Sequence, residues 1–377
     1  MKPILEILKL LSIVIAVVLI GHGQHLLSLA KTSDDPTLST QSPPAHQNGG
    51  IPVGGWGDWV YVYEPSLLPL PPEASVEHAH GIVIDDEKNL WITYKDKSDD
   101  QSKCLLRWKG GEYDKVPEFL GPGESLCTGT PHGLRSDVDP DGQMVLYHAN
   151  NEKALHKTTL DGEILWSVQG QPDETLHGGY SPTWFAAHPD SSYIYLAEGY
   201  GFSRIYVFDK SNGTYTGHYF GGKGKEHGRF ETSHAVSWDW RWNQMVVTDR
   251  ENHRFEYFDI DPKDPSKFDY THTVSFAPLL QRPCNIRMRK DGTAIIPFLE
   301  GPVGIVDQSN NLLSVINITQ VLGKDGFLHP HDAHFVPDGS GDFVLVTWNP
   351  GHIGYFRRVQ LGEKVQSEEK AKTASVQ

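Results

Sequence analysis

The sequence has few basic residues, few methionines and few cysteines, and these shortages exclude several classes of protein. Its 33 Lys and Arg against 48 Asp and Glu leave a formal net charge of −15. That deficit argues against a general nucleic-acid-binding protein, which needs a basic surface. The chain also lacks the residue period of collagen or a coiled coil, and the repeated long apolar runs of a multispanning membrane protein.

Glycine, proline and aromatic residues are plentiful by contrast. The chain has 37 Gly and 25 Pro, and its 10 Trp, 15 Tyr and 15 Phe compare with 4 Met and 3 Cys. This balance favours many short strands joined by tight turns over a bundle of helices. At 377 residues the chain is long enough for one large cored domain or two small ones.

The N-terminus resembles a secretory signal peptide. Lys2 and Lys9 precede an almost wholly apolar run over residues 11–21. The main alternative is an uncleaved membrane anchor over residues 4–20, in which Glu6 and Lys9 are the only charges. A buried helix of the folded domain is the third interpretation. Signal or anchor predicts a protein that is secreted, or that lies in the lumen of the secretory pathway, anchored to its membrane if the segment stays uncleaved.

We divide the chain into four parts on this basis. Residues 1–30 are the signal or anchor, and residues 31–50, rich in Ser, Thr, Pro, Asn and Gly, are a linker. Residues 51–362 form the folded domain. The charged tail over residues 363–377 has no apolar period, so we expect it to be disordered.

A secretory route gives the cysteines and two glycosylation triplets a meaning. Cys104 and Cys127 are candidates for a disulfide bond that leaves Cys284 free, and three reduced, buried thiols are the alternative. Asn212 and Asn317 begin triplets of the N-glycosylation type. These triplets suggest a glycoprotein, although two of them arise easily by chance in a chain of this length.

An internal repeat runs through the folded domain. Six times a short apolar strand leads through a polar turn into a second apolar strand. The turns fall at residues 85–89, 139–142, 188–190, 239–243, 290–292 and 337–339. The second strands, rich in β-forming residues, are expected at residues 90–94, 144–147, 193–196, 245–248, 294–296 and 343–346. Measured between Glu87, Asp141, Asp190, Trp242, Asp291 and Asp338, the successive steps are 54, 49, 52, 49 and 47 residues.

Third and fourth strands follow the turn in most units. Residues 204–209 and 255–259 are examples of the third strand, and residues 163–166 and 313–316 of the fourth. Four antiparallel strands repeated six times predict an all-β fold, a six-bladed β-propeller. The last unit lacks an obvious fourth strand, and we expect residues 59–63 to supply it and close the ring. A pair of β-sandwiches is the rival, but it gives no reason for a period near fifty residues.

Four histidines occupy the same place in different units. His80, His132, His234 and His331 stand at the head of the first strand in units one, two, four and six. Units two, four and six alternate around the ring, so His132, His234 and His331 are expected at one height, about 120° apart. Three converging imidazoles with an open fourth position suit a catalytic zinc ion. His329 is the rival for the ligand of unit six, and histidines hydrogen-bonded to carbonyls are the alternative to a metal site.

Two stretches carry a family likeness. Residues 198–205 and 234–254 resemble the blade-three and blade-four signatures of peptidyl-α-hydroxyglycine α-amidating lyase (peptidylamidoglycolate lyase), an NHL-like six-bladed propeller, and the likeness extends over the whole propeller. The resemblance implies that His132, His234 and His331 bind zinc.

The same resemblance assigns further residues. It implies that Tyr200 and Arg250 are catalytic, and the family's blade-one arginine falls on Lys95. A lysine cannot reproduce the planar, two-pronged cation of arginine, so this position departs from the family.

The resemblance also implies a structural calcium ion in the central channel. Its ligands would be the backbone carbonyls of Ile82 and Leu134 and the carboxylate of Asp332. Asp332 follows a zinc ligand but points the other way on a strand, which suits a separate ion.

The expected reaction is zinc-dependent cleavage of the N–C bond of a peptidyl-α-hydroxyglycine (carbinolamide) to a peptide amide and glyoxylate. Tyr200 would be the base, Arg250 would hold the substrate carboxylate and Lys95 would add positive charge. The substrate would be a small peptide or an acyl-glycine derivative. The chain has no copper-monooxygenase half, and the sequence leaves open whether a separate copper monooxygenase supplies the substrate.

Two other functions remain open at this point. One is a lactonase-like metal-dependent hydrolase, for which Asn285 is a candidate calcium ligand. The other is a non-enzymatic NHL-type binding propeller whose histidines are structural. Fold alone does not separate these from the lyase.

Overall fold

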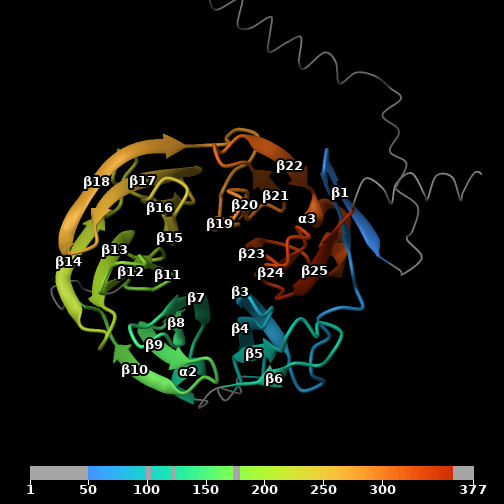
Figure 1. The fold of residues 1–377 in the computed structure, drawn as a ribbon, viewed down its shortest axis with the longest axis horizontal. Helices are drawn as coiled ribbons and strands as arrows, with labels where there is room; N and C mark the ends of the chain where they lie inside the picture. The colour runs from blue at the N-terminus through green and yellow to red at the C-terminus, as the bar shows by residue number, and fades with distance from the viewer. Residues whose placement is uncertain (1–49, 99–102, 121–123, 173–178, 360–377) are drawn as a thin grey trace, which may run out of the picture. The chain divides into compact units, whose positions relative to one another are not determined.

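The computed structural model describes residues 50–98, 103–120, 124–172 and 179–359, which form a ring of six β-sheets (Figure 1). This confirms the six-bladed propeller. The expected signal or anchor, nearly all of the linker, and the expected tail lie outside the described residues. Within the described ranges, no helix is long and apolar enough to cross a membrane.

The blades follow one another along the chain, each an antiparallel sheet whose first strand lies nearest the centre of the ring (Figure 1). Blade one holds β3 (Val76–Ile84), β4 (Leu90–Asp96), β5 (Leu105–Trp108) and β6 (Glu118–Phe119), and blade two holds β7 (Pro131–Val138), β8 (Met144–Asn150), β9 (Ala154–Thr159) and β10 (Ile164–Gln169). Blade three holds β11 (Trp184–Ala187), β12 (Tyr193–Glu198), β13 (Arg204–Asp209) and β14 (Tyr215–Gly221), and blade four holds β15 (Ser233–Asp239), β16 (Gln244–Asp249), β17 (Arg254–Asp261) and β18 (Asp264–Val274). Blade five holds β19 (Arg287–Met288), β20 (Ala294–Pro297), β21 (Val303–Val306) and β22 (Leu312–Ile316).

Blade six closes the ring with strands from both ends of the domain. Its inner strands are β23 (Pro330–Phe335), β24 (Phe343–Thr347) and β25 (Ile353–Arg358). The fourth strand is β2 (Trp59–Tyr63), which pairs with β25 in antiparallel fashion as the sequence predicted. A fifth strand that the sequence analysis did not anticipate, β1 (Ile51–Trp56), pairs with β2.

Five of the six turns contain a residue whose backbone lies in the left-handed region. Gly142, Gly292 and Gly339 have φ values of 84°, 88° and 83°, the left-handed region that glycine enters without a steric penalty. Lys88 and Asn243 adopt the same region, with φ values of 66° and 55°, in two of the other turns. The strands after the turns are the expected ones, β4, β8, β12, β16, β20 and β24.

The hydrophobic cores lie between neighbouring blades. One core packs Trp184 and Val207 of blade three against Ala235 and Met245 of blade four. Both faces of a middle strand are therefore covered, and β20 and β24 are buried at every position. This is why those strands appear in the sequence as continuous apolar runs rather than alternating ones.

Short helices and one disulfide bond complete the described structure. The helices are α2 (Glu124–Cys127), α3 (Ile318–Leu322) and the 3-10 turn η1 (Gly323–Asp325). Cys104 and Cys127 form a disulfide bond, and Cys284 is a buried free thiol. The pairing that the sequence left open is thereby confirmed.

Candidate metal centre

Four buried histidines meet at the centre of the ring. His80, His132, His234 and His331 lie on the inner strands β3, β7, β15 and β23, and each exposes 1% or less of its surface. We call these four residues the histidine cluster. Each lies at a shift of register between its strand and the next one in the blade. Such bulges bend a strand and re-aim a side chain, which is how a barrel or propeller end commonly presents functional groups.

Three of the imidazoles face one another through the same ring nitrogen. The Nε2 atom of His331 lies 3.1 Å from Nε2 of His132 and 3.1 Å from Nε2 of His234. These are the residues that alternate around the ring, as the repeat predicted. The separations are close to the distance of about 3.3 Å between nitrogens that share a tetrahedral ion at Zn–N distances of about 2.0–2.1 Å.

Hydrogen bonds on the far side of two rings fix which nitrogen is free. Nδ1 of His132 lies 2.7 Å from the carbonyl oxygen of Thr183, and Nδ1 of His234 lies 2.7 Å from that of Cys284. A carbonyl only accepts, so both Nδ1 atoms carry the proton and both Nε2 atoms present a lone pair. This is the backing that metal-binding histidines usually have.

Burial keeps the cluster neutral. It lowers the pKa of His132 to about 3, and it holds the pKa values of His234 and His331 well below their usual range. Neutral imidazoles are the form that binds metal. Nδ1 of His331 is buried and has no hydrogen-bond partner among the described residues. The Nε2 lone pairs of His132 and His234 both face Nε2 of His331, and this set of nitrogen donors is chemically suited to share one metal ion.

The possible donors extend beyond the three predicted residues. His80, His132 and His331 form one group whose ligand atoms all lie within 4.8 Å of one another, and His234, Cys284 and His331 form another. The ring of His80 stacks on that of His132 at 4.3 Å. Cys284 is the less ready donor, because burial raises the pKa of its thiol to about 12. These groups support a metal site without identifying the metal.

His329, the alternative ligand in blade six, belongs to neither of these groups. Its Nδ1 lies 3.2 Å from the carbonyl oxygen of Leu299, and its ring lies against Trp348.

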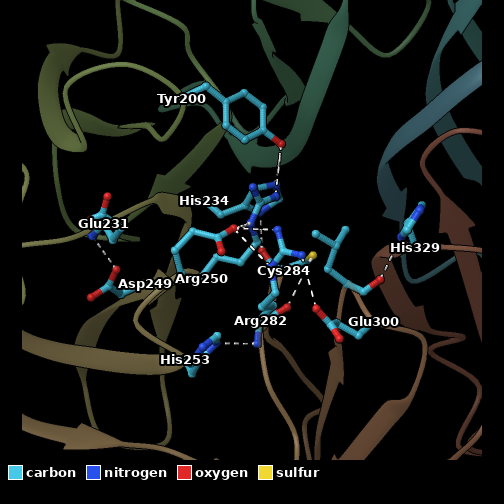
Figure 2. Close-up of polar contacts among 12 residues, drawn as sticks. Tyr200, Glu231, His234, Asp249, Arg250, His253, Arg282, Cys284, Glu300 and His329 are labelled. Atoms are coloured by element: carbon cyan, nitrogen blue, oxygen red, sulfur yellow. Dashed lines mark hydrogen bonds and ion pairs between the residues drawn. The ribbon is translucent and has the colours of Figure 1, made fainter.

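Tyr200 places its hydroxyl on the histidine cluster. Its oxygen lies 3.0 Å from Nε2 of His234 (Figure 2). It also lies 3.1 Å from Nε2 of His132, while the residue as a whole exposes 41% of its surface. Arg250 donates to the same oxygen over 3.4 Å, and its guanidinium lies 5.3 Å from the centre of the tyrosine ring. Burial of the hydroxyl end raises the pKa of Tyr200, and the charge of Arg250 opposes that rise.

A buried carboxylate shapes the loop that carries Tyr200. Glu198 accepts hydrogen bonds from the backbone N–H of Ser181 at 2.9 Å and of Phe202 at 2.5 Å. Burial raises the pKa of Glu198 to about 7. At Gly201, an added Cβ would lie 1.6 Å from the carbonyl oxygen of Gly179, so this tight turn requires glycine.

A cavity of about 370 Å³ opens onto the cluster. Its lining residues are His78, His80, Thr130, Asn151, Tyr200, Arg250, Arg282, Leu299, His331 and Trp348. The volume is that of a small-molecule pocket. One side is rich in charge, because Arg250 and Arg282, both labelled in Figure 2, lie close together and share the carboxylate of Glu251 at 3.0 Å and 2.9 Å.

The other predicted site residues lie elsewhere. Lys95 on β4 forms a salt bridge of 2.8 Å with Glu77, and the described residues that line the cavity do not include it. The predicted calcium ligands Ile82, Leu134 and Asp332 do converge, but they converge on the guanidinium of Arg287.

Several site residues escaped the sequence analysis. Arg282 lines the cavity from the connection between blades four and five, and Trp348 from the loop that follows β24. Thr183 and Cys284 contribute through their backbone carbonyls, for which no side-chain signal exists. Asn285, the candidate ligand of a hydrolase, donates instead to Asp332 at 2.8 Å.

Comparison with known proteins gives distant relatives. No family model matches the chain. The peptidyl-glycine alpha-amidating monooxygenase of Mus musculus is 26% identical over 219 residues, which cover 53% of this chain and 22% of the relative. The peptidylglycine alpha-amidating monooxygenase of Rattus norvegicus is 25% identical over 267 residues, which cover 64% of this chain and 26% of the relative. The chain thus spans roughly a quarter of the length of these curated relatives.

Solved structures agree on the fold. One assigned as a gluconolactonase superposes with a TM-score of 0.50 at 12% sequence identity, covering 78% of this chain and 94% of its own. At that identity the likeness shows the propeller alone. The sequence similarity to an enzyme and the buried His and Cys donors together indicate an enzyme-like propeller with a possible metal site.

Proposed function

We propose that this protein is a zinc-dependent lyase that cleaves the N–C bond of a peptidyl-α-hydroxyglycine, giving a peptide amide and glyoxylate. The observation that carries the proposal is the convergence of three histidine Nε2 atoms on one point beside the hydroxyl of Tyr200. Similarity to two amidating monooxygenases favours a peptidyl-glycine-derived substrate over other small molecules.

His132, His234 and His331 would hold the metal. Zinc bound there would act as a Lewis acid that lowers the pKa of the substrate hydroxyl. The carbonyls of Thr183 and Cys284 orient two of the three imidazoles and keep them in the ligand tautomer.

Tyr200 would carry the proton. The reaction breaks the bond between the amide nitrogen and the carbinol carbon, while the hydroxyl of that carbon becomes the aldehyde of glyoxylate. The proton lost from the hydroxyl balances the one gained by the departing nitrogen, so a single side chain that accepts and returns it suffices. The Tyr200 oxygen is the candidate, because it already lies beside two metal-ligand nitrogens and the guanidinium of Arg250.

Two guanidinium groups would bind the substrate carboxylate. Arg250 and Arg282 both line the cavity, and they share the single carboxylate of Glu251. Planar guanidinium groups suit two-pronged contact with a carboxylate. Arg282 could thus supply the second guanidinium that the family takes from blade one. We give Lys95 no direct contact with substrate, since its ammonium pairs with Glu77.

The experiment that tests the proposal joins metal analysis to product detection. We would measure bound metals in the purified full chain and assay the same sample for glyoxylate released from an N-acyl-α-hydroxyglycine. Stoichiometric zinc with glyoxylate release that EDTA abolishes is the expected result.

The other outcomes separate the rival functions. Zinc without glyoxylate would contradict the lyase and favour a lactonase-like hydrolase, to be assayed next with a lactone. Absence of any bound metal would contradict the metal centre and favour a binding propeller.

A further inference from the structure

Arg287 occupies the position where the family resemblance implies calcium. It lies on the inner strand β19 of blade five, and its side chain is 5% exposed. Its Nη2 donates to the carbonyl oxygens of Ile82 at 2.9 Å and Leu134 at 3.3 Å, and to Asp332 Oδ2 at 2.9 Å. Its Nε lies 3.3 Å from Asp332 Oδ1. All three expected calcium ligands therefore bind one guanidinium.

The carboxylate of Asp332 has no oxygen left for another cation. Oδ2 also accepts from the backbone N–H of Ile82 at 3.0 Å. Oδ1 also accepts from Nδ2 of Asn285 at 2.8 Å and from the backbone N–H of Ala333 at 3.0 Å. This fully hydrogen-bonded carboxylate pairs with the buried guanidinium of Arg287 at 2.9 Å.

These residues do not fit a calcium ion. Calcium takes six to eight oxygen ligands, whereas the expected set offers two carbonyls and one carboxylate that are already engaged. A divalent ion beside Arg287 would have to share the carboxylate of Asp332 with the guanidinium. The two positive charges would also repel each other strongly where water is scarce. The site already holds a second arginine nearby: burial, and after it the charge of Arg287, lowers the pKa of Arg135 to about 10.

We propose that the guanidinium of Arg287 replaces a structural calcium ion in this propeller, so that the six blades hold together without calcium. This inference goes beyond the proposed lyase and does not rest on it. Arg287 reaches from blade five to Ile82 of blade one and Leu134 of blade two, and to Asp332 of blade six.

The remaining two blades are linked to the same group. The guanidinium lies 5.4 Å from the ring centre of Trp184 in blade three. Ser237 of blade four donates to Asn285 over 3.4 Å, and Asn285 in turn donates to Asp332. The guanidinium of Arg287 and its partners thus connect the blades at the centre of the ring, as a metal ion with several protein ligands would.

The test compares calcium binding and thermal unfolding of the full chain and its variants. We would measure Tm without added divalent ions, with calcium chloride and with magnesium chloride, and measure calcium retained after desalting. The wild-type protein should retain no calcium, and its Tm should be the same in all three solutions. About one calcium ion per chain, or a calcium-specific rise in Tm of the wild type, would overturn the proposal.

One variant makes the result more specific. Arg287→Met leaves Asp332 as a buried charge without its partner, so its Tm should fall by roughly 5–10 °C. Calcium, but not magnesium, should then restore part of the loss, because the carbonyls and the carboxylate face a vacated position. An Arg287→Met protein as stable as wild type without calcium would also overturn the proposal.

Two controls keep the experiment decisive. Arg287→Lys retains a cation and should fold without any response to calcium, which preserves the test if the Met variant does not fold. Arg107→Met removes an arginine paired with Glu118 and Asp161, away from the centre, and should not become calcium-responsive.

Discussion

Two groups of side chains lie at the centre of the ring. The first is uncharged and suited to bind a metal ion, and the second is built around a buried ion pair. The histidine cluster consists of neutral donors that face one another, with one buried nitrogen lacking a partner among the described residues. In the Arg287 cluster (Ile82, Leu134, Asn285, Arg287 and Asp332), Ile82, Leu134 and Asp332 lie one or two residues after a histidine on the same strand, and the charged pair of Arg287 and Asp332 is hydrogen-bonded.

The difference shows what each cluster can do. A set of lone pairs without a cation is suited to bind one, and it lies on a cavity of about 370 Å³ that a substrate can enter. In the buried ion pair, both carboxylate oxygens already accept hydrogen bonds. The pair is therefore suited to stabilise the fold rather than to bind a ligand. Variants of one cluster should therefore alter metal content and activity, and variants of the other should alter stability.

The largest effect is expected from loss of a histidine ligand. His132→Ala and His234→Ala should each lose zinc and lyase activity together, because two imidazoles rarely hold zinc tightly. The measurement is zinc per chain beside glyoxylate release, with circular dichroism to check folding. A zinc-free variant that keeps full activity would remove the metal from the reaction.

Tyr200→Phe should separate chemistry from metal binding. Loss of the proton-carrying hydroxyl should lower kcat by about 10²–10⁴-fold while zinc content stays at the wild-type level. Tyr219→Phe, at another half-exposed tyrosine of blade three, is the matched control and should leave kcat unchanged. An unaltered rate for Tyr200→Phe would eliminate this residue as the base.

Asp332→Asn should produce the converse pattern. Removing the partner of buried Arg287 should lower the free energy of unfolding by about 3–5 kcal/mol, measured with urea. Asp86→Asn is the control, because Asp86 pairs with Lys290 at a site where both side chains are over three-quarters exposed, and such pairs contribute about 0–1 kcal/mol. Equal losses for the two variants would contradict the central role of the Arg287 cluster.

Glu198 makes the Tyr200 loop sensitive to pH. Burial raises its pKa from 4.5 to about 7, so the folded state binds the proton more tightly than the unfolded state does. The resulting stabilisation is complete below pH 4.5 and is lost as pH rises through about 7, a change of about 3 kcal/mol. Glu198→Gln should reduce the difference in unfolding free energy between pH 5 and pH 8. If that difference stays the same in the variant, other titrating groups cause it.

The smallest effect is expected at Lys95. Lys95→Arg should leave kcat/KM nearly unchanged, because Lys95 pairs with Glu77 and does not line the cavity. The assay is glyoxylate release under subsaturating substrate. A large rise or a collapse would mean that the ammonium acts on the substrate directly.

The repeat in the sequence was enough to predict most of the fold. Turns such as those at Gly142 and Gly292 place a glycine where the backbone is left-handed. The middle strands are apolar throughout because both of their faces are covered. Strand β1 was missed because its burial alternates irregularly and its glycines are typical of a loop. The disulfide bond of Cys104 and Cys127 was left open, since sequence alone does not show which thiols meet.

The candidate site was predictable only in part. Its three predicted histidines occupy equivalent positions in alternating blades, so a count along the chain was enough to bring His132, His234 and His331 together. Arg282 comes from the connection between blades four and five, and Trp348 from the loop between the second and third strands of blade six, where the repeat sets the place of a loop but not which of its side chains enters the cavity. The convergence of Arg287 on the residues expected to bind calcium arises from contacts between five blades.

The sequence by itself determined the number of blades, the order of their strands and the level of the histidines, because each depends on spacing along one chain. The tertiary structure decided what those residues meet. Backbone carbonyls orient the imidazoles, a fifth strand completes blade six, and a guanidinium lies where the family resemblance implies calcium. These outcomes depend on atoms brought together from blades far apart in the chain, which is why spacing alone does not reveal them.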